Sequence, residues 1–261
     1  MLSYQHGYHA GNLADVHKHA LLAVMLAYLT AKDKPLSYLE THAGRGLYAL
    51  DAAEALKTGE AAQGIMAAGR RGWFAPDHPY ARVLAEVRRR HGPQAYPGSP
   101  LVAAHLLRPG DRIHLGELHP QEFAALCDAM LPYDAHCRQI DAAALALALT
   151  PPDPRRGLML IDPSYEVKAD YEALPRLIAQ VARKWNVGII ALWYPILADR
   201  RHRPMLAALE ALDLPGVLRH EVRFPPARPG HGMAGSGLFI TNAPYGTEAE
   251  AARLGRLFAA L

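Results

Sequence analysis

The chain has 261 residues, and 51% of them are apolar, so it can bury a large core as one domain or as a domain with an insertion. The formal net charge of +3 permits a polyanionic partner without demanding one. Apolar runs are too short for a membrane span, the first residues lack a signal-peptide pattern, and two cysteines are too few for a disulfide framework. We therefore expect a cytoplasmic protein without membrane association.

Short apolar segments bounded by turn or polar residues predict seven β-strands. In chain order they cover residues 35–40, 111–117, 137–141, 157–162, 187–195, 217–224 and 237–242. Helical patterns separate most of them, at residues 15–31, 120–131 and 170–185. Alternation of strand and helix predicts an α/β fold with a parallel, doubly wound sheet. A loop instead of a helix joins the last two strands, which indicates an antiparallel edge.

Two stretches interrupt this alternation. Between residues 46 and 97 the pattern is helical or irregular, with repeated Gly and Pro breaks. We predict an inserted helical subdomain over residues 47–96 and a main domain formed by residues 1–46 and 97–261. The slightly basic charge of the insertion fits either a solvated helical cap or a nucleic-acid surface. The loop at residues 225–237 is rich in Gly and Pro, which indicates a mobile or ligand-facing segment.

Three successive predicted strands end on acids, namely Glu117, Asp141 and Asp162. In an open parallel sheet, ligands bind outside the carboxyl ends of the strands. A carboxylate at a buried strand end is costly unless it has a partner, so these acids indicate a binding site at that edge. After the first strand, the Gly-Arg-Gly of residues 44–46 lets the backbone approach a ligand closely, although one such turn is a weak signal.

An adenosine-containing cofactor fits these positions. The acid after the second strand is the usual partner of ribose hydroxyls, which assigns Glu117 to a ribose. That acid usually follows the glycine turn by ~20 residues. Here the separation is longer by about the length of the insertion, so the two irregularities explain each other. Asp141 can accept a hydrogen bond from an adenine amine. Because no second glycine-rich turn and no Walker lysine are present, S-adenosylmethionine fits better than NAD or ATP.

The fourth predicted strand runs into Asp162-Pro163-Ser164-Tyr165. This resembles the (Asn/Asp)-Pro-Pro-(Tyr/Phe) signature of methyltransferases that act on nucleobase amines. The adenine amine is a poor nucleophile because its lone pair is delocalised into the ring. The Asp162 carboxylate and the Pro163 carbonyl, which the fixed φ of proline holds in place, can accept both amine hydrogens and orient the lone pair. Tyr165 supplies a face on which a flipped base stacks. The alternative is a turn in which Pro163 only ends the strand.

Longer motifs extend the resemblance over nearly the whole chain. They are MLSYQHGYHAGNLADVHKH (residues 1–19), YLETHAGRGLY, YPGSPLVA (residues 96–103), GELHP, RRGLMLIDPSYE, ALWYP and GMAGSG. Together they resemble the RlmJ family of bacterial 23S ribosomal RNA adenine-N6 methyltransferases, and HAGN-x-ADV-x-KH is far more specific than any Gly-x-Gly. The resemblance implies a Rossmann-like S-adenosylmethionine-dependent methyltransferase sheet with a small inserted helical subdomain.

The resemblance also implies roles for particular residues. Asp162 would be the catalytic acceptor, with Pro163 and Tyr165 beside it. Tyr4 would touch the RNA substrate, and Lys18 would lie near it. The residues that would line the S-adenosylmethionine site are His19, His42, Ser99, Glu117, Asp141 and Ala142. The implied partner is 23S ribosomal RNA, free or in early assembly particles, with no obligate protein partner evident.

Two positions depart from the family pattern. Ser164 replaces the second proline, so the residue before it is less restricted. Ala142 stands where the family tends to carry glycine, so its methyl group can crowd the cofactor. Two other functions stay open: a DNA adenine-N6 methyltransferase, because a flipped adenine is the same in either nucleic acid, and a cofactor-binding nucleic-acid-binding protein with little catalysis. The spacing of His9, His17 and His19 is not a zinc signature, so no metal site is expected.

Overall fold

The computed structural model describes residues 5–225 and 232–261. The strands are β1 (Ser37–Glu40), β2 (Leu47–Ala49), β3 (Ala95–Pro97), β4 (Arg112–Gly116), β5 (Ala135–Arg138), β6 (Gly157–Ile161), β7 (Ile189–Leu197), β8 (Leu218–Arg223) and β9 (Met233–Thr241). The helices are η1 (His6–Tyr8), a 3₁₀ helix, and α1 (Leu13–Thr30), α2 (Ala53–Thr58), α3 (Glu60–Gln63), α4 (Ile65–Arg70), α5 (Pro79–His91), α6 (Ser99–Leu106), α7 (Pro120–Met130), α8 (Ala142–Ala148), α9 (Asp170–Lys184), α10 (His202–Glu210) and α11 (Thr247–Ala259). Within these two ranges, no helix combines the length and the apolar composition needed to cross a membrane.

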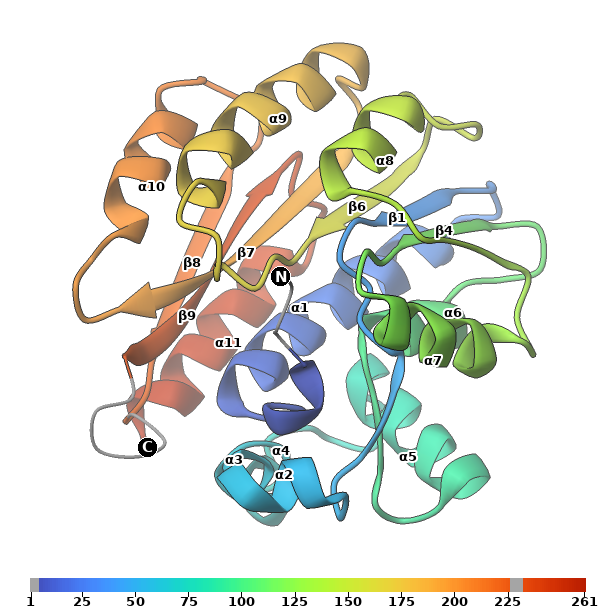
Figure 1. Ribbon diagram of the computed structural model, residues 1–261, viewed down its shortest axis with the longest axis vertical. Coiled ribbons are helices and arrows are strands. Elements are labelled where there is room, and N and C mark those ends of the chain that lie inside the picture. Colours follow the sequence, from blue (N-terminus) through green and yellow to red (C-terminus); the bar gives the residue numbers. More distant parts are fainter. Residues whose placement is uncertain (1–4, 226–231) are drawn as a thin grey trace.

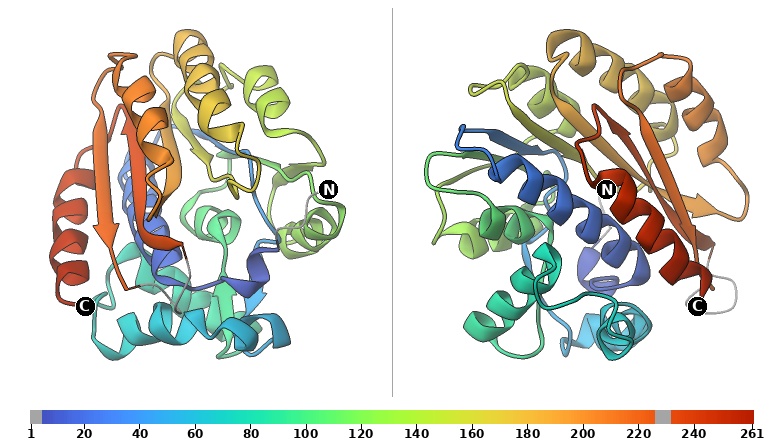
Figure 2. Two further views of the ribbon diagram at one scale, coloured as in Figure 1. Left: turned by 60° about the vertical axis from the view of Figure 1, so that its left-hand side comes forward. Right: turned by 180° about the vertical axis from the view of Figure 1, so that it is seen from behind.

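A seven-stranded sheet forms the centre of the molecule, with strand order β5-β4-β1-β6-β7-β9-β8. β1 pairs in parallel with β4 and β6, and β5 and β7 extend the parallel sheet on either side. Helices cover both faces (Figures 1 and 2): α1 contacts α6 and α11 on one face, and α9 contacts α8 and α10 on the other. The chain order reverses between β1 and β6, where open α/β sheets bind ligands. The predicted doubly wound α/β sheet is confirmed.

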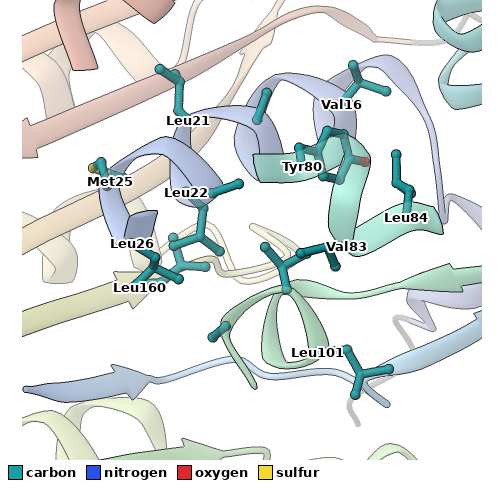
Figure 3. Packing of buried hydrophobic residues seen from close by; sticks show 14 of the residues in the cluster. Val16, Leu21, Leu22, Met25, Leu26, Tyr80, Val83, Leu84, Leu101 and Leu160 are labelled. Atoms are coloured by element: carbon teal, nitrogen blue, oxygen red, sulfur yellow. The ribbon is translucent and has the colours of Figure 1, made fainter. Parts of the chain in front are cut away.

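Alternate residues of the central strands pack into two separate cores. On β6, Leu158 and Leu160 belong to the cluster that includes α1, whereas Met159 and Ile161 belong to the cluster that includes α9. Figure 3 shows the first of these cores, with Leu26 of α1 beside Leu160. Successive side chains of a strand point to opposite faces. A strand covered on both faces therefore has the unbroken apolar sequence GLMLI that β6 shows.

Helix α1 is buried over most of its surface, and three consecutive polar side chains on it reach three parts of the fold. His17 lies 2.9 Å from the Ser236 hydroxyl of β9 through Nδ1 and 2.9 Å from His220 of β8 through Nε2. Lys18 reaches the carboxyl end of β6, and His19 reaches β3. Successive residues of an α-helix point ~100° apart. These three connections are possible because α1 has the sheet, the C-terminal helix and residues 47–96 around it.

The predicted strands of the sheet are all present, with two corrections. The third begins two residues and ends three residues earlier than predicted: β5 ends at Arg138, and Asp141 lies beyond it as the N-cap of α8. The loop between the last two strands does produce an antiparallel pair, β8 with β9. However, β9 is inserted between β7 and β8 and is antiparallel to both, so the edge strand β8 runs parallel to β7.

The loop predicted at residues 225–237 is wrong for its second half. Residues 233–237 belong to β9, and residues 226–231 lie outside the described part of the chain. Two glycines that indicated a loop mark close packing instead. A Cβ on Gly235 would lie 2.3 Å from the carbonyl oxygen of Val222, and one on Gly237 would lie 2.2 Å from the ring of Tyr194. Glycine inside a strand often marks such a close approach.

Residues 47–96 contain the helices α2 to α5, which fits the predicted helical insertion, and the structure adds an antiparallel ribbon of β2 and β3. Each ribbon strand has three residues, too few for a recognisable alternating pattern. Tyr80 and Val83 of α5 pack in the same hydrophobic cluster as α1 (Figure 3). Because this segment and the main sheet share a core, the division into 1–46 with 97–261 and 47–96 stays a prediction.

Candidate active site

A pocket of about 680 Å³ lies at the carboxyl ends of β1, β4 and β6 and along β7. Its volume is in the range of small-molecule and cofactor sites. The predicted site residues that line it are Lys18, His19, His42, Ser99, Glu117, Asp141, Ala142, Asp162, Pro163 and Tyr165. Tyr4 lies outside the described residues. The fold thus brings every predicted site residue that it describes into one cavity.

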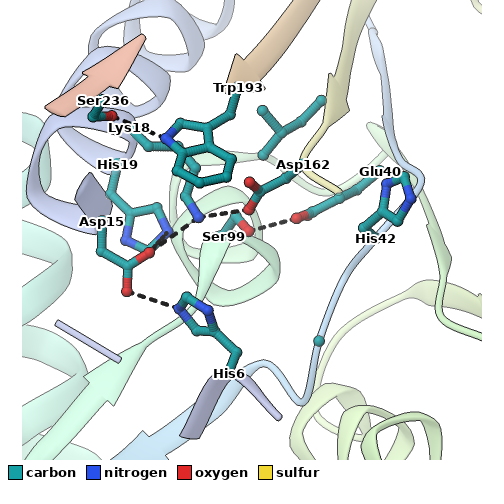
Figure 4. Close-up of polar contacts among 12 residues, drawn as sticks. His6, Asp15, Lys18, His19, Glu40, His42, Ser99, Asp162, Trp193 and Ser236 are labelled. Atoms are coloured by element: carbon teal, nitrogen blue, oxygen red, sulfur yellow. Dashed lines mark hydrogen bonds and ion pairs between the residues drawn. The ribbon is translucent and has the colours of Figure 1, made fainter. Parts of the chain in front are cut away.

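A buried ion-pair network holds the carboxylate of Asp162. Lys18, predicted to lie near the RNA, is only 4% exposed, and its ammonium lies 2.5 Å from Asp162 Oδ2 and 3.0 Å from Asp15 Oδ1 (Figure 4). Burial opposes the charge of Lys18, but the carboxylates of Asp162 and Asp15 outweigh burial and raise the pKa of Lys18. Among the described residues, Asp162 Oδ1 accepts no hydrogen bond. One oxygen of Asp162 is therefore fixed, and the other is available to a ligand.

Asp15 is a residue of this site that the sequence analysis missed. Its Oδ2 lies 2.9 Å from the backbone nitrogen of Gly11, which donates to it, and 2.9 Å from Nε2 of His6. Burial raises the pKa of Asp15, but His6, Lys18 and His19 together hold that pKa well below its usual range. A signal was present in the sequence, because an acid three residues before a lysine lies on the same face of a helix.

Three aromatic rings form the wall of the pocket next to Asp162. The ring centroid of Tyr165 lies 4.6 Å from that of Tyr171 and 6.1 Å from that of Trp193. The Tyr165 hydroxyl donates to the Trp193 carbonyl over 2.8 Å, and the Trp193 indole N–H donates to the Ser236 hydroxyl over 2.9 Å. Tyr165 has a φ of 57°, a left-handed conformation that is costly for an aromatic residue. These contacts hold it there. Tyr171 and Trp193 were not predicted from the sequence, although ALWYP contains the latter.

Glu117, predicted to bind a ribose, also holds the glycine turn after β1. Its Oε2 accepts a hydrogen bond from the Gly44 N–H and its Oε1 accepts one from the His119 N–H, both over 2.8 Å. Gly44 has a φ of 60°, and a Cβ on it would lie 2.5 Å from the Tyr48 hydroxyl, so glycine is needed here. An ionised carboxylate has about four lone-pair sites. Glu117 can therefore accept ribose hydroxyls while it holds the turn.

Asp141 combines a structural contact with a position in the pocket. As the N-cap of α8, its Oδ1 accepts hydrogen bonds from the N–H groups of Ala143 and Ala144, over 3.0 and 3.1 Å. Its Oδ2 has no such partner in the part of the chain that the structure describes. Ala142 is the first residue of α8 and also lines the pocket, so its methyl group can contact a bound cofactor. The remaining oxygen of Asp141 is available to an amine.

His42 and Ser99 occupy the pocket wall near β1 (Figure 4). His42 is bonded through Nδ1 to the Thr41 hydroxyl over 2.8 Å, and burial lowers the pKa of His42 to about 4, so its ring is neutral. Ser99 donates to Glu40, which also accepts from the Tyr38 hydroxyl over 2.7 Å. Glu40 is fully buried, and burial raises its pKa to about 8. The sequence analysis missed Glu40, although it ends the first strand as other acids end later ones.

His19 indicates that the pocket takes a polar ligand. Its Nδ1 lies 3.0 Å from the Tyr96 hydroxyl. Its Nε2 is buried and has no hydrogen-bond partner within residues 5–225 and 232–261. A buried polar atom without a partner costs free energy, so a polar group of a bound molecule fits beside His19. Together with the free oxygen of Asp141 and the remaining lone pairs of Glu117, this set of residues fits an adenosine linked to an amino acid, as in S-adenosylmethionine.

Comparisons with known proteins show the family of the chain. A family model described as "Ribosomal RNA large subunit methyltransferase D, RlmJ" matches residues 33–260. Ribosomal RNA large subunit methyltransferase J of Escherichia coli (strain K12) is 39% identical over 256 residues, which cover 96% of this chain and 90% of that protein. The protein of the same name from Haemophilus influenzae is 37% identical over 263 residues, with the same coverage. A crystal structure of a Legionella pneumophila protein is 35% identical, has a TM-score of 0.85 and covers 95% of this chain and 92% of that one.

Proposed function

Because the chain belongs to the family described as ribosomal RNA large subunit methyltransferase D, RlmJ, we propose that it transfers a methyl group from S-adenosylmethionine to the N6 amine of an adenine in 23S ribosomal RNA. The observation that carries the proposal is the position of the Asp162 carboxylate. In strand order it stands between the acids after β4 and β5 on one side and the aromatic wall along β7 on the other. One cavity therefore has room for a cofactor and for a base.

On the cofactor side, the strand order suggests which residue takes which group. When bound, S-adenosylmethionine supplies an electrophilic methyl group on a sulfonium. Asp141, after β5, would accept a hydrogen bond from the adenine amine, and Glu117, after β4, would accept the ribose hydroxyls. Ser99 and His19 lie beyond β1, toward α1, and would contact the amino-acid end. This arrangement leaves Asp162, at the end of β6, for the substrate.

On the substrate side, Asp162 Oδ1 and the carbonyl of Pro163 would accept the two hydrogens of N6. Holding both hydrogens directs the nitrogen lone pair away from the ring and toward the methyl group. Lys18 keeps Oδ2 in place, and Tyr165 offers a face for stacking of a flipped base. After the new bond forms, N6 has to lose a proton, and Asp162 is the base in contact with it.

The substrate context is part of the same proposal: the reaction would take place on 23S ribosomal RNA that is free or in early assembly particles, in the cytoplasm. The target base has to leave its helix to enter the pocket, which is easier where the RNA is accessible. The curated relatives are named for ribosomal RNA. A DNA adenine is chemically the same at N6, and only contacts to the 2′-hydroxyl would separate the two nucleic acids.

The proposal is tested by methyl transfer from radiolabelled S-adenosylmethionine. We expect labelling of 23S ribosomal RNA from a strain that lacks the enzyme, little labelling of adenine-containing DNA, and none of RNA from a strain that has it. Labelling of early assembly particles but not of mature large subunits would support the substrate context. Mapping of the modified base should identify N6-methyladenine. Equal labelling of DNA, or cofactor binding without any transfer, would contradict the proposal.

A further inference from the structure

A chain of buried hydrogen bonds connects residues 47–96 to the pocket. The hydroxyls of Tyr80 in α5 and Tyr96 in β3 lie 2.9 Å apart, and the Tyr96 hydroxyl lies 3.0 Å from His19 Nδ1. Each of the three side chains is at most 1% exposed. Neither tyrosine lines the pocket, whereas His19 does. Any effect of the tyrosine hydroxyls on a bound molecule would therefore be transmitted through the ring of His19.

The hydrogen bonds among Tyr80, Tyr96 and His19 can run in two directions, which differ in the proton that is left without an acceptor. If His19 Nδ1 carried its proton, it would donate to Tyr96, Tyr96 would donate to Tyr80, and the buried Tyr80 hydroxyl would have no acceptor among the described residues. In the opposite direction, Tyr80 donates to Tyr96, Tyr96 donates to His19 Nδ1, and both hydroxyl protons are used. In either direction one buried proton lacks an acceptor among the described residues: that of the Tyr80 hydroxyl in the first, and the Nε2–H of His19 in the second. Only the second direction places this donor at the pocket, where a bound ligand can accept it, so binding of a polar ligand favours the second direction.

The charge near His19 supports the same direction. Burial lowers the pKa of His19 to about 3, so its ring is neutral and carries one proton. His19 Nε2 lies 4.0 Å from Oδ1 of Asp15, too far for a hydrogen bond. At this distance an ionised carboxylate attracts an N–H and repels a nitrogen lone pair. Lys18 and His6 oppose this effect, but after burial the Asp15 carboxylate is the largest influence on His19, so it favours a proton on Nε2. That atom is buried and lacks an acceptor among the described residues.

We propose that Tyr96, backed by Tyr80, is a positioning residue for cofactor binding: it holds His19 in the tautomer whose Nε2–H donates to the carboxylate of the cofactor's amino-acid end. This inference rests on the proposed function, because it takes S-adenosylmethionine as the ligand. The acids after β5 and β4 take the adenine and the ribose, so the amino-acid end faces α1. Its carboxylate is the charged acceptor in that part of the cofactor, and a charge-assisted hydrogen bond would satisfy the buried N–H.

The test uses Tyr96→Phe, which removes the hydroxyl and keeps the ring. Calorimetry should show a Kd for S-adenosylhomocysteine that is raised about 3- to 10-fold, the effect of one hydrogen bond. The rate of methyl transfer at saturating cofactor should stay close to that of the unmodified protein. Tyr80→Phe should raise the Kd less, because Tyr96 can still donate to His19. If Tyr96→Phe does not fold, Tyr80→Phe carries the test.

A matched control is available in Tyr133→Phe. The Tyr133 hydroxyl lies 2.9 Å from Nε2 of His105, so this variant also removes a tyrosine–histidine hydrogen bond, but neither residue lines the pocket. Its thermal stability should fall about as much as that of Tyr96→Phe, and its affinity for S-adenosylhomocysteine should not change. A loss of affinity in both variants would mean that general loosening of the fold is the cause, and would overturn the proposal.

Two further measurements separate positioning from packing. Nitrogen-15 NMR of labelled histidines, with the His19 signal assigned through His19→Gln, should show the Nε2–H tautomer in the cofactor-free protein and a mixture in Tyr96→Phe. An S-adenosylhomocysteine analogue without the carboxylate should bind the unmodified protein more weakly, with no further loss in Tyr96→Phe. A proton on Nδ1 in the unmodified protein, or an unchanged Kd in Tyr96→Phe, would overturn this inference alone. Absence of any cofactor binding in the unmodified protein would instead overturn the proposed function.

Discussion

The proposed cofactor side and the proposed substrate side of the pocket hold their carboxylates in different ways. On the cofactor side, Glu117 and Asp141 accept hydrogen bonds from backbone N–H groups of nearby loops and of a helix end. On the substrate side, Asp162 is held by the side chain of Lys18, which is 144 residues away in the chain. A backbone donor keeps its position in most variants, whereas a side-chain donor is lost with one substitution. The substrate side should therefore be more sensitive to mutation than the cofactor side.

The largest effect is expected from Asp162→Ala. This variant removes both the acceptor for the N6 hydrogens and the base, and such groups contribute roughly 10²- to 10⁴-fold to a rate. Methyl transfer under single-turnover conditions should fall by about that factor. Calorimetric affinity for S-adenosylhomocysteine should stay within a few-fold, because the acids of the cofactor side remain. Asp162→Asn should also lose most transfer. Full activity of the alanine variant would show that Asp162 does not touch the reacting amine.

Lys18→Met should have the next largest effect, because it leaves the carboxylates of Asp15 and Asp162 buried without their cation. Breaking a buried ion pair by removal of one partner costs about 3–5 kcal/mol, so the melting temperature should fall clearly. We expect methyl transfer to drop about 10- to 100-fold, since Asp162 loses its orientation. Lys32→Met, at an exposed lysine just after α1, is the control and should leave both quantities near their original values. A Lys18→Met protein as stable and active as that control would mean that the network is unimportant.

Glu117→Ala should act on cofactor binding with little effect on the chemical step. It removes the predicted ribose partner and two hydrogen bonds from the backbone of residues 44 and 119. Loss of hydrogen bonds to a charged group costs about 1.5–3 kcal/mol, which corresponds to ~10-fold or more in Kd. Calorimetry measures the Kd, and the rate at saturating cofactor should change much less. A rate that falls as far as in Asp162→Ala would remove the distinction between the two sides of the pocket.

Glu40, at the end of β1 between the cofactor side and the substrate side, should make the free energy of unfolding depend on pH. Burial raises the pKa of Glu40 in the folded chain to about 8 from a usual value of 4.5. Between these values, unfolding releases a proton that the folded chain keeps, so the contribution of Glu40 is complete below pH 4.5 and decreases as the pH rises to about 8. Glu40→Gln does not ionise and should weaken this decrease. Denaturant unfolding gives the free energy of unfolding of both proteins at pH 5 and at pH 8. An equal decrease between these pH values in the unmodified protein and in Glu40→Gln would contradict the raised pKa of Glu40.

The smallest effect is expected from Ser164→Pro, which introduces the second proline of the Asp-Pro-Pro-Tyr signature that residues 162–165 resemble. The backbone N–H of Ser164 donates no hydrogen bond among the described residues, so proline would remove no donor in use. A compatible proline stabilises a protein by only about 0.4–1 kcal/mol. The rate of methyl transfer should stay the same or rise slightly. A large loss of activity in a folded variant would show that the left-handed backbone at Tyr165 depends on serine before it.

The difference between carboxylates held by backbone N–H groups and a carboxylate held by a distant side chain also explains which parts of the site could be predicted from the sequence. The strands, their order of alternation and the acids at their ends could be predicted, because apolar periodicity is local and parallel strands bring their carboxyl ends together. Glu117 and Asp141 could be predicted from their places after strands; the backbone donors to Asp141 are also local, whereas one donor to Glu117, Gly44, lies 73 residues away. By contrast, the role of Asp15 depends on a lysine whose other partner lies 144 residues away. A local sequence pattern cannot show a contact between residues that far apart in the chain.

Other omissions have equally physical causes. Trp193 lies inside a strand that is apolar throughout, so its sequence context indicates core packing, and only the fold shows that its ring borders the pocket. Glu40 was overlooked because its partner hydroxyls come from β1 itself and from the start of α6, far along the chain. The antiparallel placement of β9 depends on pairing with two strands at once, which the loop before it does not specify.

The position of α1 also has a consequence for synthesis of the protein. His17 is made 219 residues before its partner Ser236, and it is fully buried in the finished fold. At ~5–20 residues per second, translation takes on the order of 10 s or more to cover that interval. During this time the apolar faces of α1 and its three polar side chains lack part of their surroundings. We expect nascent chains that end before β9 to expose α1 to proteases and chaperones, so a helix that is made early is among the last to be fully packed.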